Sequence, residues 1–322
     1  MQKLKYFIPL LLIITLSVTS CDSDSIGTGD DDGPLLGGAP APGPGGPLGG
    51  SEFDLDTAIE LMFLSIEAYQ MLADSEDGTT FTLPDPYDLI IQILTPESFT
   101  SEGFAEEVPI AFIATKDDNI YVVFRGTKTI SEWITDATFP FVDYIDPGGG
   151  MTEEGFTDFY ESFAGLIISE VQKLKDQGGF NNLYITGHSL GGALVGVSTP
   201  DLLMKTGFEN PISYSFASPR VGNSDYKTYF DAFGLDSWRV FNTNDLVPML
   251  PPELLGYTHV DTGFPITFGQ PIEDPLDFST IAEDHDSCTY YNTLCEMLTT
   301  GETDIMDCKL KIKGLDDCNE DL

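Results

Sequence analysis

The sequence predicts an α/β fold, with a central, mostly parallel β-sheet and helices on both of its faces. Short apolar runs alternate with longer amphipathic segments between residues 54 and 242, which is typical of strands connected by helices. A glycine-rich turn also joins one apolar run directly to a helical segment at residues 184–193. The chain has 322 residues, of which 41% are hydrophobic, so it is long enough for one large domain with extensions.

The individual elements follow from local patterns. Apolar residues at helical spacing predict helices at residues 54–73, 156–174 and 285–298. Apolar runs bounded by turn residues predict strands at residues 88–95, 109–115, 120–124, 183–186, 212–217 and 238–242. Gly178 and Gly179 should end the second helix, and Pro200 should kink or restart the helix after the glycine-rich turn.

Residues 1–20 have the composition of a signal peptide. Lys3 and Lys5 precede a short apolar stretch, and small residues then lead into Cys21. The stretch is too short to span a membrane. A cysteine at the expected cleavage point resembles the signal of bacterial lipoproteins, in which that cysteine carries the lipid. We therefore expect an exported lipoprotein, anchored at the periplasmic face or the cell surface, or a secreted protein if Cys21 carries no lipid.

Residues 21–52 form the second predicted segment, which consists mostly of glycine and proline from residue 27 to residue 50. Such a composition cannot bury a core, so we expect a flexible tether of about 30 residues that spans on the order of 30 Å. The folded domain should begin near Phe53 and extend to residue 322, with a cysteine-rich C-terminal extension.

The net charge excludes one class of partner. The chain has 14 Lys and Arg against 53 Asp and Glu, a formal charge of −39, and the carboxylates are spread along its length. Because phosphate binding requires clustered basic residues, nucleic-acid binding is not expected. We ascribe the charge to solubility or a salty habitat, and not to a cation site.

Four further cysteines near the C-terminus predict two disulfides, since the protein is expected to be exported. They are Cys288, Cys295, Cys308 and Cys318. If residues 285–298 form a helix, the first two lie about 10 Å apart along its axis, too far to bridge. Each should then pair with Cys308 or Cys318. The closely spaced pairs typical of zinc ligands are absent from the sequence, so no metal site is expected.

The segment Gly187-His188-Ser189-Leu190-Gly191 is the strongest indication of chemistry. A strand, a sharp turn and a helix in this order form a nucleophile elbow, which is typical of the α/β-hydrolase fold. Side chains at Gly187 and Gly191 would collide where the helix and the strand approach each other. We predict that Ser189 is the nucleophile and that the Leu190 N–H, at the helix N-terminus, donates to an oxyanion.

A serine nucleophile needs a base, and the chain has three histidines. The side chain of His188 should point away from the neighbouring Ser189 hydroxyl. His285 follows a long, proline-rich loop and starts a predicted helix, a position that can reach Ser189. His259 resembles a structural histidine at the start of a strand. We predict His285 as the base, with His259 as the alternative.

The acid of a triad should follow a strand and precede the histidine. Asp245 lies just beyond the predicted strand at residues 238–242. There it would orient the imidazole of His285 and stabilise its cationic form. The sequence therefore predicts a Ser189–Asp245–His285 triad that requires no cofactor.

Four motifs together resemble the fungal-type triacylglycerol lipase family, also called lipase class 3. They are Phe124-Arg-Gly-Thr127, the GHSLGGA elbow, Asn244-Asp245-Leu-Val-Pro248 and the late His285. The similarity runs from about Phe53 to Asn292. It implies that Thr127 is an oxyanion-hole residue. It also implies that residues 129–138, with Trp133 and Ile134, form a short helical lid over the serine, for which a fixed surface helix is the alternative.

Two features depart from the family. Glu153 stands where many relatives have a histidine, which should alter the rim of the pocket and leave the reaction intact. The cysteine-rich segment beyond Asn292 does not map to the family.

The resemblance and the triad predict a serine carboxylic-ester hydrolase, foremost a triacylglycerol lipase that acts on neutral acyl esters through an acyl-enzyme. A short-chain or feruloyl-type esterase and a phospholipase are alternatives on the same scaffold, although the acidic surface disfavours anionic phospholipid. A tethered binding protein without turnover is the alternative from another class, and the presence of a serine, an acid and a histidine argues against it. The sequence leaves the oligomeric state open.

Overall fold

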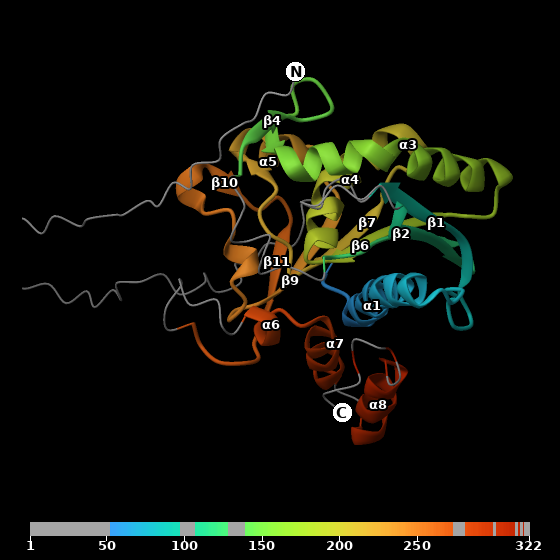
Figure 1. The fold of residues 1–322 in the computed structure, drawn as a ribbon. Helices are drawn as coiled ribbons and strands as arrows, with labels where there is room; N and C mark the ends of the chain where they lie inside the picture. Colours follow the sequence, from blue (N-terminus) through green and yellow to red (C-terminus); the bar gives the residue numbers. More distant parts are fainter. Residues whose placement is uncertain are drawn as a thin grey trace, which may run out of the picture. The chain divides into compact units, whose positions relative to one another are not determined.

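A seven-stranded sheet forms the centre of the domain, in the order β1-β2-β3-β6-β7-β9-β11 (Figure 1). Its strands are β1 (Asp88–Pro96), β2 (Glu107–Lys116), β3 (Asn119–Phe124), β6 (Asn182–His188), β7 (Ile212–Phe216), β9 (Asp236–Asn242) and β11 (Thr262–Ile266). The pairs β1–β2 and β2–β3 are antiparallel, and the four pairs from β3 to β11 are parallel. The predicted mostly parallel sheet is therefore confirmed.

The computed structural model of this chain describes residues 52–96, 107–127, 139–272, 281–298 and 301–312, together with Leu315 and Cys318. All of them belong to one compact unit. The predicted signal peptide with Cys21, nearly all of the predicted tether, and the predicted lid residues Trp133 and Ile134 lie outside the described residues. Among the described residues, no helix is both long and apolar enough to cross a bilayer.

Helices cover both faces of the sheet (Figure 1). On one face lie α3 (Glu154–Gln177), α4 (Leu190–Thr206) and α5 (Ser224–Asp231), and on the other lie α1 (Leu55–Asp77) and α7 (Ser287–Glu296). Strand β3 shows why two cores form. Ile120, Val122 and Phe124 point into the α3–α4 core, whereas Tyr121 and Val123 point into the α1–α7 core. This is the alternation expected of a strand buried on both faces.

The remaining elements are short. A second sheet, in the order β10-β8-β5-β4, contains β4 (Phe141–Asp143), β5 (Met151–Glu153), β8 (Gly222–Asn223) and β10 (Tyr257–Thr258). The short helices are η2 (Val247–Met249), η3 (Glu253–Leu255), α6 (Ile281–Asp284), α8 (Glu302–Lys309) and η4 (Leu310–Ile312).

The expectation that Pro200 restarts its helix is wrong, because α4 runs through Pro200 without interruption. A proline lacks the N–H that would bond to the carbonyl oxygen four residues earlier, here that of Gly196. The hydroxyl of Tyr226, on α5, donates to this oxygen at 2.6 Å. A side chain distant in sequence thus replaces the missing helical hydrogen bond.

The predicted disulfide pattern is confirmed. Cys288 pairs with Cys318, and Cys295 pairs with Cys308. Both bridges fasten the C-terminal segment to α7, which itself packs against α1. Near the N-terminal end of the described residues, Phe53 stacks on Phe264 of β11, with ring centroids 3.6 Å apart.

Candidate active site

Ser189 lies in a sharp turn between β6 and α4. Its φ of 61° and ψ of −124° are unusual for a residue with a side chain, and a hydrogen bond of 2.9 Å from its N–H to the Phe216 carbonyl holds the turn. A Cβ at Gly187 would lie 2.5 Å from the backbone of Gly191, and one at Gly191 would lie 2.4 Å from the Phe124 carbonyl oxygen. The predicted reason for both glycines is confirmed.

The chain segment after β3 lies beside this turn. Strands β3 and β6 are parallel neighbours, with Phe124 opposite Gly187, so the loops that follow them start at the same edge of the sheet. A Cβ at Gly126 would lie 2.8 Å from the carbonyl oxygen of His188. Thr127, the next residue, is half-buried. The backbone of the predicted oxyanion residue thus leaves the sheet next to the predicted nucleophile.

Two features provide hydrogen-bond donors at this edge. Leu190 is the first residue of α4, and the first N–H groups of a helix have no acceptor within the helix. Arg125 is buried, and its guanidinium donates to the carbonyls of Pro109 at 2.8 Å and Gly126 at 2.6 Å. The second bond fixes the peptide that joins Gly126 to Thr127. This bracing role of Arg125 was not predicted from the sequence.

Asp245 and His285 are brought together although 40 residues separate them. Asp245 lies three residues beyond β9, and its Oδ2 is 2.7 Å from Nδ1 of His285. Oδ1 of the same carboxyl group accepts from the N–H of Val247 at 2.9 Å. Both side chains are buried. Because a carboxylate only accepts hydrogen bonds, Nδ1 of His285 carries the hydrogen of this bond, and in the neutral tautomer of this kind the lone pair lies on Nε2.

Two residues that were not predicted support this pair. The hydroxyl of Tyr290, on α7, donates to Oδ2 of Asp245 at 2.9 Å and accepts from the N–H of Asn242 at 2.7 Å. The side chain of Asn242 donates to the carbonyl of Asp284, next to His285, at 2.9 Å. The two chain segments that carry Asp245 and His285 are thus bound to each other on both sides.

His188 links His285 to the elbow. The two rings have centroids 4.7 Å apart, and Nδ1 of His188 is 2.9 Å from the hydroxyl of Tyr69 on α1. Burial lowers the pKa of His188 well below its usual range, so His188 is neutral. Since Ser189 directly follows His188, this contact holds His285 beside the turn.

Ser189 Oγ and His285 Nε2 are both buried, and neither has a hydrogen-bond partner among the described residues. Catalytic hydrogen bonds are often long or poorly aligned before substrate binds. The predicted nucleophile and the predicted base thus retain the atoms that proton transfer between them would use.

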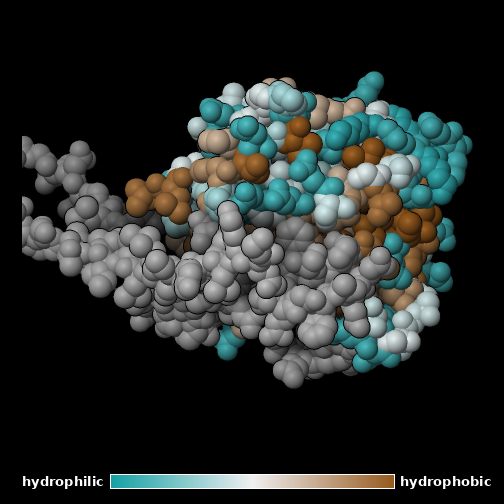
Figure 2. Space-filling model, turned by 45° about the horizontal axis from the view of Figure 1, so that its top comes forward, coloured by the Kyte–Doolittle hydropathy of each residue, from teal (hydrophilic) through white to brown (hydrophobic). Residues whose placement is uncertain are grey.

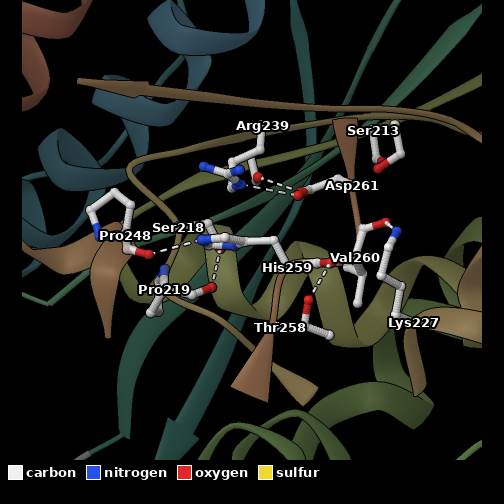
Figure 3. Close-up of polar contacts among 12 residues, drawn as sticks. Ser213, Ser218, Pro219, Lys227, Arg239, Pro248, Thr258, His259, Val260 and Asp261 are labelled. Atoms are coloured by element: carbon white, nitrogen blue, oxygen red, sulfur yellow. Dashed lines mark hydrogen bonds and ion pairs between the residues drawn. The ribbon is translucent and has the colours of Figure 1, made fainter. Parts of the chain in front are cut away.

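His259, the alternative base, makes a different contact (Figure 3). It follows β10, so the expectation that it starts a strand is wrong. Its Nε2 lies 2.8 Å from the carbonyl oxygen of Pro248. Burial lowers the pKa of His259 well below its usual range, and the charges of Arg239 and Arg220 lower it further. The neutral ring therefore donates Nε2–H to Pro248 and fixes the loop that follows Asp245.

A buried ion pair lies in the same region of Figure 3. Nε of Arg239 is 3.2 Å from Oδ1 of Asp261, and the hydroxyl of Ser215 donates to Oδ2 of Asp261 at 2.9 Å. These bonds join β9, β7 and the start of β11, and so fix the strand that precedes Asp245.

Glu153 is buried at the N-terminus of α3. Its Oε2 accepts from the N–H of Phe156 at 2.8 Å, which makes Glu153 the N-cap of the helix. Burial raises the pKa of Glu153, although backbone hydrogen bonds from Phe156 and Gly155 oppose this effect.

Within the described part of the chain, no three His, Cys, Asp or Glu side chains are grouped as metal ligands would be.

Comparison with known proteins extends these observations. Residues 121–255 match the model of the family described as lipase (class 3). The chain is 33% identical over 166 residues to a lipase of Rhizomucor miehei, which is 50% of this chain and 46% of that protein. It is 37% identical over 161 residues to a secreted mono- and diacylglycerol lipase A of Penicillium cyclopium, 48% of this chain and 51% of that protein. The chain thus spans about half the length of the curated relatives it matches.

Solved structures resemble the domain as well. The lipase of Rhizopus microsporus var. chinensis superposes with a TM-score of 0.58 at 26% identity, covering 71% of this chain and 86% of that one. The native complex of Rhizomucor miehei lipase with its propeptide gives 0.56 at 26% identity, covering 66% and 68%. The predicted α/β-hydrolase fold is confirmed, and the match supports the predicted lipase family.

Proposed function

We propose that this chain, which matches the lipase (class 3) model over residues 121–255, is a serine carboxylic-ester hydrolase that acts on neutral acyl esters. The observation that carries the proposal is the buried pair of Asp245 and His285, held by the ring of His188 beside the turn at Ser189. The hydrogen bond from Nδ1 to Asp245 orients the imidazole of His285 so that Nε2 can accept a proton. An acid, a histidine and a serine arranged in this way activate the serine hydroxyl.

The proposed reaction runs in two halves. His285 removes the proton of Ser189, whose oxygen attacks the ester carbonyl, while the backbone N–H groups of Thr127 and Leu190 donate to the oxyanion. His285 then protonates the leaving alcohol. Water, deprotonated by the same histidine, hydrolyses the acyl-enzyme and restores the serine.

Acylglycerols are the favoured substrates, since the relatives named above are described as a lipase and a mono- and diacylglycerol lipase. A phospholipase is the second candidate. The chain is 30% identical over 220 residues to phospholipase A1-IIgamma of Arabidopsis thaliana, 54% of this chain and 51% of that protein. The net charge of −39 disfavours anionic phospholipids but not zwitterionic ones.

Hydrolysis of p-nitrophenyl esters from acetate to palmitate tests the proposal, with Ser189→Ala as the comparison. We expect kcat to fall by at least about 1,000-fold in the variant. The chain-length optimum separates a lipase from a short-chain esterase, and parallel assays with triolein, diolein and phosphatidylcholine separate the lipid classes. A well-folded wild-type protein that hydrolyses none of these esters would contradict the proposal.

We also propose that the protein is exported and carries a lipid on Cys21, the first residue of a tether to the membrane that spans residues 21–52. The two disulfides support export, because such bonds form in oxidising compartments. Cells that produce the chain should incorporate radiolabelled fatty acid into the wild type and not into Cys21→Ala. Equal labelling of the two proteins would rule out the lipid anchor and leave a secreted enzyme.

A further inference from the structure

Three apolar side chains protrude from one short loop, residues 249–255. Met249 is 48% exposed, Leu254 is 92% exposed and Leu255 is 52% exposed. In Figure 2, brown surface projects at the left of the molecule, where Figure 1 shows the segment next to β10. Scattered exposed apolar residues are common, whereas a group of them within seven residues is a candidate contact surface.

This loop lies at the catalytic edge of the sheet. It starts four residues after Asp245, and parallel strands β3, β6 and β9 all end at the edge where Thr127, Ser189 and Asp245 follow them. At its other end, Tyr257 stacks on Phe141 with ring centroids 4.1 Å apart. The loop therefore flanks the proposed active site outside the segment predicted as the lid.

Arg220 forms hydrogen bonds to three carbonyls of the loop and an ion pair with its carboxylate. The backbone N–H of Arg220 donates to the Leu250 carbonyl at 2.6 Å, and its guanidinium donates to the carbonyls of Pro251, at 3.0 Å, and Met249. The same guanidinium forms an ion pair of 3.0 Å with Glu253. A surface that meets the loop would thus find the carbonyls of residues 249–251 already paired, which lowers the cost of burying them.

We propose that residues 249–255 form a fixed anchor that inserts Met249, Leu254 and Leu255 into an uncharged or zwitterionic lipid surface. The inference rests on the proposed function and names how the enzyme meets its substrate. A second copy of the chain fits less well, because a stable interface buries about 800 Å² on each partner, far more than three side chains provide. An anionic surface is disfavoured by the net charge of −39.

Co-sedimentation with phosphatidylcholine vesicles tests the anchor. All samples carry Cys21→Ala and Ser189→Ala, so that neither a lipid anchor nor hydrolysis contributes. We expect Leu254→Asp to reduce partitioning at least about 10-fold, since it loses the transfer of one large apolar side chain. The matched control is Leu166→Asp on α3, which replaces a leucine that is 55% exposed elsewhere on the domain. It should bind like its parent.

Turnover measurements separate this inference from the proposed function. With Ser189 restored, Leu254→Asp should hydrolyse dissolved p-nitrophenyl acetate at the parent rate and an emulsified ester at least about 10-fold more slowly. Equal vesicle binding by parent, Leu254→Asp and Leu166→Asp would overturn the anchor even if the enzyme is active. The anchor would also be overturned if the parent formed a dimer in size-exclusion chromatography and Leu254→Asp were a monomer. Absence of p-nitrophenyl ester hydrolysis in the parent would instead contradict the proposed function.

Discussion

Tyr290 and Asp245 are joined by a hydrogen bond of 2.9 Å from the tyrosine hydroxyl to Oδ2, the same carboxyl oxygen that lies 2.7 Å from Nδ1 of His285. The hydroxyl therefore helps to decide where this oxygen points. A carboxyl group held by several donors presents a fixed acceptor to the imidazole, which keeps the ring in one orientation.

Removal of this hydroxyl should slow turnover. We expect Tyr290→Phe to lower kcat/KM about 10-fold, the effect of one hydrogen bond to a charged group. Tyr291→Phe is the matched control, because the Tyr291 hydroxyl donates to the Cys308 carbonyl at 3.0 Å and not to Asp245. It should change kcat/KM less than about 2-fold. Equal losses in the two variants would show that the Tyr290 hydroxyl acts only on the stability of α7.

The contact between His188 and His285 leads to a second prediction. His188→Ala removes the ring that packs on His285, so kcat should fall about 10-fold, since a small misplacement of a catalytic group is costly. KM should change little, because His188 is buried beneath the turn. Tyr69→Phe keeps both rings and loses only the hydroxyl bonded to His188, so it should lower kcat less. A greater effect of Tyr69→Phe on kcat would assign the main role to that hydroxyl.

The sequence predicted the elbow and six of the seven strands of the central sheet, because both depend on local patterns, but it missed β11, which contains a glycine and a proline. Strand β3, for example, contains a continuous apolar run from Ile120 to Phe124. Gly187 and Gly191 indicate the close approach of β6 and α4 within five residues. The effect of Pro200 could not be predicted from the local sequence. Its effect on α4 depends on the Tyr226 hydroxyl, which reaches Gly196 from a helix 30 residues away.

The supporting residues of the site escaped prediction for the same reason. Arg125, Asn242 and Tyr290 act through hydrogen bonds to residues 16 to 45 positions away in the sequence, namely Pro109, Asp284 and Asp245. No spacing or composition distinguishes them from other polar residues of the chain. His259 is predicted to be structural, and its partner, the Pro248 carbonyl, is visible only in the folded loop.

The two disulfides provide a third prediction. Replacing Cys295 and Cys308 by serine opens a bridge that closes 13 residues of chain, and should lower the free energy of unfolding by about 3 kcal/mol. Replacing Cys288 and Cys318, 30 residues apart, should cost about as much or slightly more. Thermal unfolding of each double variant, and of the wild type with and without reductant, measures this. Unchanged melting temperatures would contradict the prediction.

Glu67 leads to a prediction about pH. It lies on α1 and is 4% exposed, and burial, followed by the charge of Asp74, raises its pKa to about 7 from an ordinary value near 4.5. The folded state therefore binds more protons than the unfolded state between these values, and stability falls as the pH rises through this window. Glu67→Gln should remove this loss, raising the free energy of unfolding at pH 8 by at most about 3 kcal/mol. At pH 4 the two proteins should be equally stable.

Glu60 lies two turns earlier on the same helix and is the matched control. Its pKa is shifted in the opposite direction from that of Glu67. Burial raises the pKa of Glu60, but hydrogen bonds from Lys116, Tyr87 and Tyr121 outweigh it, so the net pKa is lowered. Ionised Glu60 therefore stabilises the fold above its unfolded pKa, and this contribution is lost as the pH falls through the folded pKa. Glu60→Gln should lower the melting temperature at pH 8, where Glu67→Gln raises it. Urea unfolding at both pH values compares the variants, and a shift of the same sign in both would contradict the assignment of the two carboxyl groups.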